Sequence, residues 1–236
     1  MKSAPTTPRA LQAIIFDFDG VIANSEPVHL RAFQDTLAEE GVTLASDEYY
    51  ARYLGYDDVG MFEALGRDRE LPMTTLSVTR LVARKGARMQ ELMRSGAVLF
   101  AGAAEFVRQS AGQVPVAIAS GALRHEIVTT LEAAGLSDAF TVIVAAGDTP
   151  ESKPSPAPYQ LAFELLRQDG GRALDARKCV AIEDSRWGLA SAQGAGLRCV
   201  GVTTSYSADA LPGAEIVVGG LADLTMAMLD DLCARP

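Results

Sequence analysis

The sequence predicts an α/β fold: a doubly wound parallel sheet, interrupted by an inserted all-α domain. Short apolar runs alternate with helical segments from about residue 97 onward, which is typical of parallel strands joined by helices. A further apolar run lies near the start of the chain, whereas residues 25–96 show helical periodicity and no alternating strand. We therefore expect a core domain of residues 1–24 and 97–236 and a helical domain of residues 25–96.

The strands of the core are predicted from continuous apolar runs. Ala13-Ile14-Ile15-Phe16 is such a run, of the kind that a strand buried on both faces shows. The helices between the strands follow from helical periodicity. The expected strands are residues 13–16, 114–119, 142–145, 179–182, 200–202 and 216–218, and the expected core helices are residues 123–134, 156–166 and 187–195. This order of elements indicates a Rossmann-like sheet with helices on both faces.

The inserted domain is expected to begin its first helix near Pro27. Ser25 or Glu26 can cap that helix, and proline suits a first helical turn. We expect this helix to run from residue 27 to residue 40. Further helical stretches are expected at residues 47–52, 57–65 and 74–94.

Composition restricts the classes of function. The 236 residues are 48% hydrophobic, which is ample for a core, and the formal net charge of −9 disfavours binding to nucleic acid. No apolar run is long enough for a signal peptide or a membrane span. The three cysteines Cys179, Cys199 and Cys233 lack metal-ligand spacing, which fits a reduced compartment. We expect a cytoplasmic protein with neither a nucleic acid nor a membrane partner.

Two aspartates lie directly after the first predicted strand. Asp17 and Asp19 emerge at the carboxyl end of that strand, where open α/β sheets bind their ligands. Alternate residues of extended chain share a face, so the two carboxylates lie close together. Two like charges are unfavourable there unless a cation lies between them or one keeps its proton. The pattern indicates a metal site with proton transfer, although aspartates that merely cap a turn before Gly20 would look similar.

Three more short motifs follow later strands. Ser120-Gly121 comes after residues 114–119, Lys153 precedes Pro154 in a loop, and Glu183-Asp184 follows residues 179–182. Each alone has an ordinary explanation: a serine that caps a helix, a solvated lysine, and an acidic pair that caps the helix near Trp187. The motifs occur in this order along the chain, and each lies near the end of a predicted buried strand. This arrangement favours one common phosphoryl-transfer site.

Taken together, these motifs resemble the haloacid dehalogenase superfamily of phosphohydrolases and phosphomutases. The most specific stretches are DFDGVIANSEPVH at residues 17–29, SKPSPAPY at 152–159 and IEDSRWGLASAQGAG at 182–196. The resemblance is to the branch with a helical cap inserted after the first motif, which includes β-phosphoglucomutase and phosphoglycolate-phosphatase-like enzymes. It implies that residues 25–96 are that cap and that Mg²⁺ is the cofactor, and nothing in the sequence calls for an organic one.

The resemblance also implies roles for the acidic residues. Asp17 would attack phosphorus and form an aspartyl phosphate, and Asp19 would be the general acid and base, with its backbone carbonyl on the metal. Asp184 would complete the Mg²⁺ site, for which oxygen ligands are preferred. Glu183 beside it would act on the metal directly or, as we favour, through water or another side chain.

The remaining site residues are assigned in the same way. Lys153 would neutralise the nucleophile and the transferring phosphoryl group, and Ser120 with the Gly121 amide would bind phosphate. His29 would help to position Asp19, unless it is simply a surface histidine; His125 looks structural or exposed. The residues expected to choose the substrate lie in the cap loop: Arg52, Leu54, Gly55 and Tyr56.

We favour a phosphatase acting on a small phosphorylated metabolite over a sugar phosphomutase. The sugar mutases of the family place a lysine just before the cap-loop glycine and an arginine shortly after it, where this chain has Leu54 and Asp58. An acidic, aromatic loop is poorly suited to a second phosphate. The mutase stays open because Arg52 can contribute charge, while a dehalogenase, a phosphonatase and a phospho-accepting signalling module are minor alternatives. We expect a monomer.

Overall fold

The computed structural model describes residues 9–54, 56–94, 99–169 and 173–235. The chain divides into two compact units, Met1–Asn24 with Ala97–Pro236 and Ser25–Gly96. Their boundaries are those of the core and the helical domain named above.

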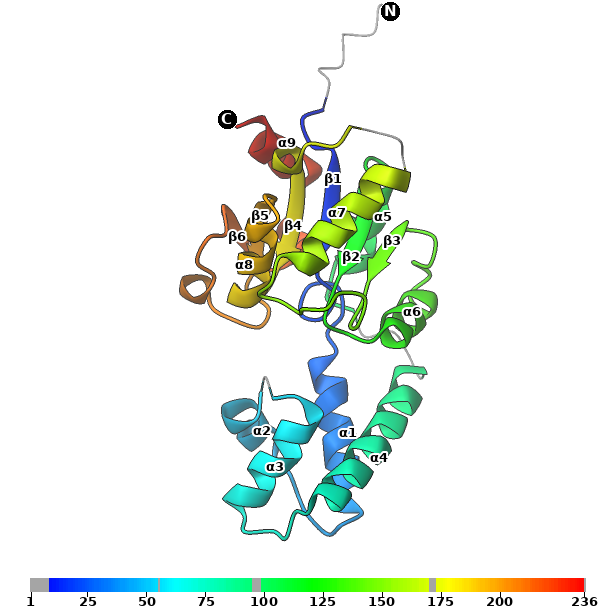
Figure 1. Ribbon diagram of the computed structural model, residues 1–236, viewed down its shortest axis with the longest axis vertical. Helices are drawn as coiled ribbons and strands as arrows, with labels where there is room; N and C mark the ends of the chain where they lie inside the picture. The colour runs from blue at the N-terminus through cyan, green and yellow to red at the C-terminus, as the bar shows by residue number, and fades with distance from the viewer. Residues whose placement is uncertain (1–8, 55, 95–98, 170–172, 236) are drawn as a thin grey trace, which may run out of the picture. The chain divides into compact units, whose positions relative to one another are not determined.

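The first unit is built on a six-stranded parallel sheet with the order β3-β2-β1-β4-β5-β6 (Figure 1). β1 lies in the middle, with Ile14 opposite Val116 of β2 on one side and Val180 of β4 on the other. The predicted doubly wound parallel sheet is confirmed. The strands are β1 (Ala13–Phe16), β2 (Val116–Ala119), β3 (Val142–Val144), β4 (Cys179–Glu183), β5 (Arg198–Val202) and β6 (Ile216–Val218).

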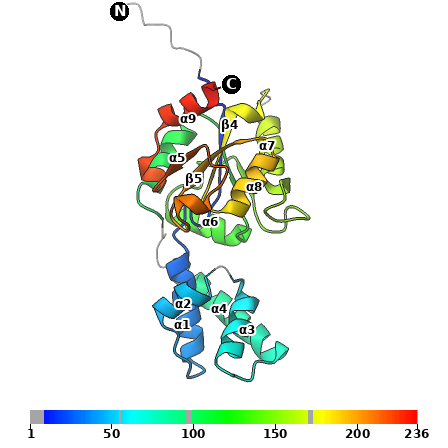
Figure 2. The same cartoon turned by 90° about the vertical axis from the view of Figure 1, so that its left-hand side faces the viewer.

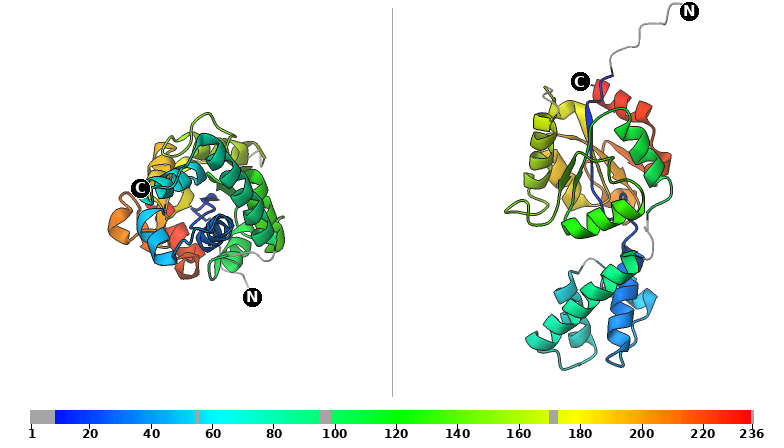
Figure 3. Two further views of the ribbon diagram at one scale, coloured as in Figure 1. Left: turned by 90° about the horizontal axis from the view of Figure 1, so that it is seen from below. Right: turned by 90° about the vertical axis from the view of Figure 1, so that its right-hand side faces the viewer.

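Helices cover both faces of this sheet, as Figure 2 and the right-hand view of Figure 3 show. Successive residues of β1 point to opposite faces, so Ile14 and Phe16 pack in one apolar cluster and Ala13 and Ile15 in the other. Two-sided burial explains why the run is apolar without alternation. The first cluster includes residues of α5 (Ala103–Ala111), α6 (Arg124–Ala133) and α9 (Met226–Ala234), and the second includes residues of α7 (Ala157–Asp169) and α8 (Arg186–Gly194).

Several predicted limits were wrong by a few residues. The second strand begins at Val116 and not at residue 114; the backbone carbonyl of Pro115 still accepts a hydrogen bond from Ile14, but proline has no N–H with which to extend the ladder. Helices α5 and α9 were not predicted. Three short 3₁₀ helices, also not predicted, complete the unit: η1 (Ala176–Lys178), η2 (Ala208–Ala210) and η3 (Leu221–Asp223).

The second unit is helical, as predicted. It contains α1 (Glu26–Ala38), α2 (Ser46–Arg52), α3 (Asp58–Asp68) and α4 (Thr75–Arg94). Pro27 lies in the first turn of α1, although Ser25 at the N-cap makes no side-chain capping hydrogen bond. Phe33 packs against Tyr49 and Phe62 in a buried apolar cluster to which α1, α2, α3 and α4 all contribute.

Within the described part of the chain, every helix is too short or too polar to cross a membrane. The three cysteines are free thiols and are buried. Buried free cysteines of this kind act as small core residues.

Candidate active site

The candidate site lies at the carboxyl ends of three adjacent strands. Asp17 follows β1, Ser120 follows β2, and Asp184 follows β4. Since parallel strands all end at the same edge of a sheet, residues more than 160 positions apart in sequence meet there. The backbone secures this arrangement, because the Asp17 amide donates to the carbonyl of Ile182 at 2.9 Å.

Lys153 bridges two carboxylates of the site. Its Nζ lies 3.0 Å from Oδ1 of Asp17 and 2.6 Å from Oε1 of Glu183, and its side chain is 13% exposed. Burial by itself lowers the pKa of the lysine, but the charges of Asp17 and Glu183 outweigh it and raise the pKa above its ordinary value. Lys153 is therefore a partly buried, charged ammonium that contacts the side chain of Asp17.

Glu183 is fully buried at the end of β4 and has hydrogen-bond donors at both oxygens. Oε1 accepts from Lys153 and, at 2.8 Å, from the Tyr159 hydroxyl, while Oε2 accepts from the Asp184 amide at 3.2 Å. Burial, and then the charge of Glu183, raise the pKa of Tyr159, so that it remains a donor. These contacts make Glu183 the residue that orients Lys153, in keeping with an indirect role toward a metal.

Gly188 makes room for Glu183. A Cβ at this position of α8 would lie 1.9 Å from Oε1 of Glu183, well inside any real contact. The N-cap of α8 is Ser185, whose hydroxyl accepts from the Gly188 amide at 3.1 Å. The alternative interpretation of Glu183 and Asp184 as the N-cap pair of this helix is therefore wrong.

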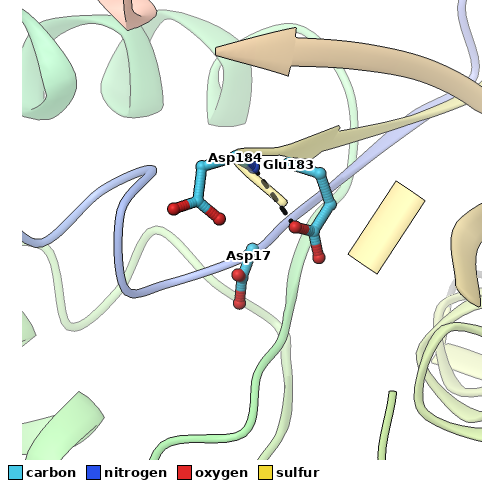
Figure 4. A group of neighbouring side chains, drawn as sticks. All are labelled: Asp17, Glu183 and Asp184. Atoms are coloured by element: carbon cyan, nitrogen blue, oxygen red, sulfur yellow. Dashed lines mark hydrogen bonds between the residues drawn. The ribbon is translucent and has the colours of Figure 1, made fainter. Parts of the chain in front are cut away.

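Asp17, Glu183 and Asp184 form a compact carboxylate cluster (Figure 4). One oxygen from each lies within 4.8 Å of the others, and all three residues are buried. Burial, and then the charge of Asp17, raise the pKa of Asp184 to about 7. A buried set of carboxylate oxygens with this spacing fits a divalent cation such as Mg²⁺.

The turn after β1 carries Asp19, which is half-buried and forms an isolated parallel bridge with Ala23. The side chain of Asp19 is not part of the carboxylate cluster. The backbone carbonyl of Asp19 therefore remains the predicted metal ligand of this residue. Gly20 is required next to it: its φ is +78°, and a Cβ there would lie 1.9 Å from Oδ2 of Asp184. Thr204 holds this turn by donating its hydroxyl proton to the Gly20 carbonyl, and Ser205 hydrogen-bonds to the Asp184 side chain.

Ser120 and Gly121 form the next part of the same edge. Ser120 is buried, and its hydroxyl accepts from the Ala122 amide at 3.1 Å. The serine does not cap a helix, because α6 begins only at Arg124. Gly121 is exposed, and nothing lies within 4 Å of where its Cβ would be.

The predicted cap residues all belong to the second unit. Leu54 and Tyr56 are 39% and 50% exposed, and Gly55 lies outside the described residues. Arg52 forms an ion pair with Asp68, with 2.7 Å between Nη2 and Oδ2. His29 is not a surface residue: its Nδ1 lies 2.8 Å from the Nζ of Lys85, which is itself buried. His125, by contrast, is exposed.

Several residues of these networks were not singled out from the sequence, among them Tyr159, Gly188 and Lys85. The sequence pattern does mark Lys85 as unusual. It lies between Leu81 and Met89 in the apolar row of α4, where a lysine is unexpected. Tyr159 and Gly188 stand in ordinary helical positions, and no sequence pattern distinguishes them from packing residues.

Comparisons with known proteins identify the family of this chain. Residues 14–202 match the family model described as haloacid dehalogenase-like hydrolase. The chain is 36% identical to the protein CbbY of Rhodobacter capsulatus, with 84% of this chain and 87% of that protein covered. It is 30% identical to hexitol phosphatase B of Escherichia coli K12, with 98% of each covered. The structure of CbbY from Rhodobacter sphaeroides in complex with xylulose-1,5-bisphosphate superposes with a TM-score of 0.76 at 28% identity, covering 93% of this chain and 99% of that one.

Proposed function

Because this chain belongs to the haloacid dehalogenase-like hydrolase family, we propose that it is a Mg²⁺-dependent phosphatase that hydrolyses a small phosphorylated metabolite through an aspartyl phosphate on Asp17. The predicted enzyme class is confirmed by the family match and by relatives named as phosphatases. The signalling module considered as an alternative is set aside on the same ground. The mechanism and the choice of substrate are the parts that we propose.

The contact between Lys153 and Asp17 carries this proposal. A carboxylate nucleophile that attacks a phosphate dianion meets strong repulsion unless fixed positive charge lies beside it. Lys153 supplies that charge 3.0 Å from Oδ1 of Asp17, in a buried site where electrostatic interactions are strong. Phe18 also donates its amide to Oδ1, at 2.7 Å, so we assign the attack on phosphorus to Oδ2.

Asp17 and Asp184 would hold the Mg²⁺ ion with the backbone carbonyl of Asp19. Bound there, the ion would supply positive charge that offsets the repulsion between the phosphate and the carboxylates. Glu183 is already engaged by Lys153 and Tyr159, so we propose that it supports the site without ligating the metal itself.

The proposed reaction has two steps. In the first, Asp17 forms a bond to phosphorus as the ester P–O bond breaks, and Asp19 gives its proton to the departing alkoxide. In the second, Asp19 takes a proton from water as its oxygen attacks phosphorus, and the acyl phosphate bond breaks to release inorganic phosphate and restore Asp17. Ser120 and the Gly121 amide donate hydrogen bonds to the phosphoryl oxygens in both steps.

We propose that the cap loop selects the leaving group. A lid that contacts the non-reacting part of a substrate is the usual source of such selection. Relatives named above act on hexitol phosphates or bind xylulose-1,5-bisphosphate, so small phosphorylated sugars and polyols are the class to test.

The test is a panel of sugar, polyol and short-acid phosphates, assayed for free phosphate with Mg²⁺ and with chelator. We expect chelator-sensitive phosphate release that Asp17→Asn abolishes. Asp138→Asn is the matched control, because it makes the same substitution at an exposed position of the same unit. Activity of the Asp17 variant near that of the wild type would disprove the nucleophile. Conversion of β-glucose 1-phosphate to glucose 6-phosphate without phosphate release would make the protein a mutase.

A further inference from the structure

Two loops at the carboxyl edge of the sheet are joined to each other. We call residues 120–123 the phosphate loop, because they follow β2 and include Ser120 and Gly121 of the candidate site. Residues 145–148 follow β3, the strand next to β2, and we call them the support loop. The position of the phosphate loop matters, because hydrogen-bond donors stabilise a transferring phosphoryl group only when they are aimed at its oxygens.

Backbone hydrogen bonds join the phosphate loop to β3 and to the support loop. The Ser120 amide donates to the carbonyl of Val144, the last residue of β3, at 2.9 Å. The Ala146 amide donates to the Ala122 carbonyl, also at 2.9 Å. Gly121 lies between these two contacts and has no side chain to pack. Its position therefore depends on how firmly the residues on either side of it are held.

A side-chain ion pair joins the same segments. Arg124, the first residue of α6, donates from Nη2 to Oδ2 of Asp148 at 2.6 Å and to the Ile143 carbonyl at 2.8 Å. The same Oδ2 accepts from the Ala145 amide at 2.8 Å, and the Asp148 amide donates to the Ala145 carbonyl at 3.1 Å. One guanidinium nitrogen and one carboxylate oxygen thus connect the residue after the phosphate loop to β3 and to both ends of the support loop.

The ion pair of Arg124 differs from that of Arg167 with Glu164, which lies within α7. Arg167 and Glu164 are 51% and 46% exposed at their side chains and lie 2.7 Å apart. Arg124 and Asp148 are 53% and 33% exposed, so solvent screens both pairs and neither should add much stability. The pair of Arg124, however, joins segments 24 positions apart, next to the phosphate loop. We therefore expect it to affect the position of that loop more than the stability of the fold.

We propose that Arg124 and Asp148 are positioning residues that hold Ser120 and the Gly121 amide in place to bind the phosphoryl group. This inference rests on the proposed phosphatase function and adds two residues to its site. Both residues act through the phosphate loop. Loss of the ion pair leaves the backbone hydrogen bonds of that loop but frees the start of α6, which directly follows it. Donors in a functional site must stay within about 0.5 Å of their productive positions, so this loosening weakens phosphate binding.

The test measures kcat and KM for p-nitrophenyl phosphate and for the sugar and polyol phosphates of the panel. Arg124→Met and Asp148→Ala should each lower kcat/KM about tenfold, less than the loss of about 100-fold that misplacement by 1 Å produces. The factor should be similar for every ester, because all of them share the phosphoryl group. The loss should appear mainly in KM, since the same donors hold that group before and during the reaction. Arg167→Met is the matched control and should keep the wild-type values.

Two further variants test whether the ion pair supplies position. Asp148→Asn keeps an oxygen that can accept from Arg124 and from the Ala145 amide, so it should keep most of the wild-type kcat/KM. The double variant Arg124→Met with Asp148→Ala should lose no more than the worse single variant, because the two residues act through one contact. Circular dichroism should show that Arg124→Met melts within about 4 °C of the wild type, since an exposed ion pair adds little stability.

The outcomes separate this inference from the proposed function. Equal kcat/KM in folded Arg124→Met and Arg167→Met, or a loss confined to kcat, would overturn the inference and leave the phosphatase intact. An equal loss in Asp148→Asn and Asp148→Ala would assign the effect to charge and overturn the positioning role, as would a double variant whose loss is the product of the two single losses.

Folding of the variants is decisive as well. If Arg124→Met does not fold, Asp148→Ala takes its place in the comparison with Arg167→Met. If neither variant folds, the ion pair is structural and the inference is overturned. Failure of the wild type to release phosphate from any ester of the panel would overturn the proposed function and the inference with it.

Discussion

Replacing Gly188 with alanine should displace the side chain that orients Lys153. Gly188 is the third residue of α8, and the carboxylate of Glu183 lies directly against it. The added Cβ would lie 1.9 Å from Oε1, whereas ordinary contact begins at 3.4 Å, so the carboxylate must move by the difference of about 1.5 Å. That movement breaks the contacts of Glu183 with Lys153 and Tyr159, which are 2.6 and 2.8 Å long.

The expected effects follow from those distances. Overpacking costs about 1–3 kcal/mol, and a weakened hydrogen bond to a charged group costs about 1.5–3 kcal/mol. The better helix propensity of alanine offsets about 1 kcal/mol of this, which leaves a net loss of about 1.5–5 kcal/mol. For a chain of this length the loss lowers the melting temperature by about 3–20 °C. Misplacing the lysine by an ångström or more should lower kcat/KM about 100-fold.

Gly86→Ala is the matched control. Gly86 also lies inside a helix, α4, but nothing lies within 4 Å of where its Cβ would be. This variant should melt at the same temperature as the wild type or slightly higher and should keep its activity. Both variants are compared by calorimetry and by hydrolysis of p-nitrophenyl phosphate. If Gly188→Ala matches Gly86→Ala in both assays, the close packing of Glu183 against α8 has no part in catalysis.

Three further predictions concern single residues. Asp19→Asn should lose most activity and accumulate a phosphoenzyme that intact-mass spectrometry detects; unchanged steady-state rates would refute its acid-base role. Tyr159→Phe removes a buried donor to Glu183 and should cost about 1.5–3 kcal/mol of stability with a smaller loss of activity than Gly188→Ala, whereas an unchanged urea midpoint would contradict that contact. His29 binds a proton with a pKa of about 4 in the folded chain and 6.5 in the unfolded chain, so the unfolded state gains protons first and stability falls as the pH drops through this interval. His29→Gln should lack this loss of about 3 kcal/mol, and an equal loss in both proteins between pH 7 and pH 4 would count against a buried neutral imidazole.

Much of the fold followed from local sequence rules. The strands of a doubly wound sheet are buried on both faces, so each appears as a continuous apolar run, and the runs predicted all six strands of the sheet. The limits were less accurate, because they depend on ladder hydrogen bonds with neighbouring strands. Val114 and Pro115 are part of the apolar run but precede β2, since proline has no N–H to give. Helices α5 and α9, at residues 103–111 and 226–234, were missed.

The same rules brought Asp17, Lys153, Glu183 and Asp184 into one candidate site, because the topology of a parallel sheet brings its carboxyl ends together. A sequence indicates that a side chain lies near such an edge, but not what it touches. The position of Lys153 between two carboxylates depends on distances between segments 30 and more residues apart.

What the sequence by itself determined was therefore the order of the elements, the family and the residue types at the end of each strand. Tertiary structure decided how the charges are paired: Tyr159 with Glu183, Lys85 with Asp58, Arg52 with Asp68. The physical reason is that secondary structure follows from short-range periodicity, whereas the charge of a site depends on which groups are buried next to each other. Whether a lysine is free to bind a substrate or already neutralised is decided by the carboxylate that the fold places beside it.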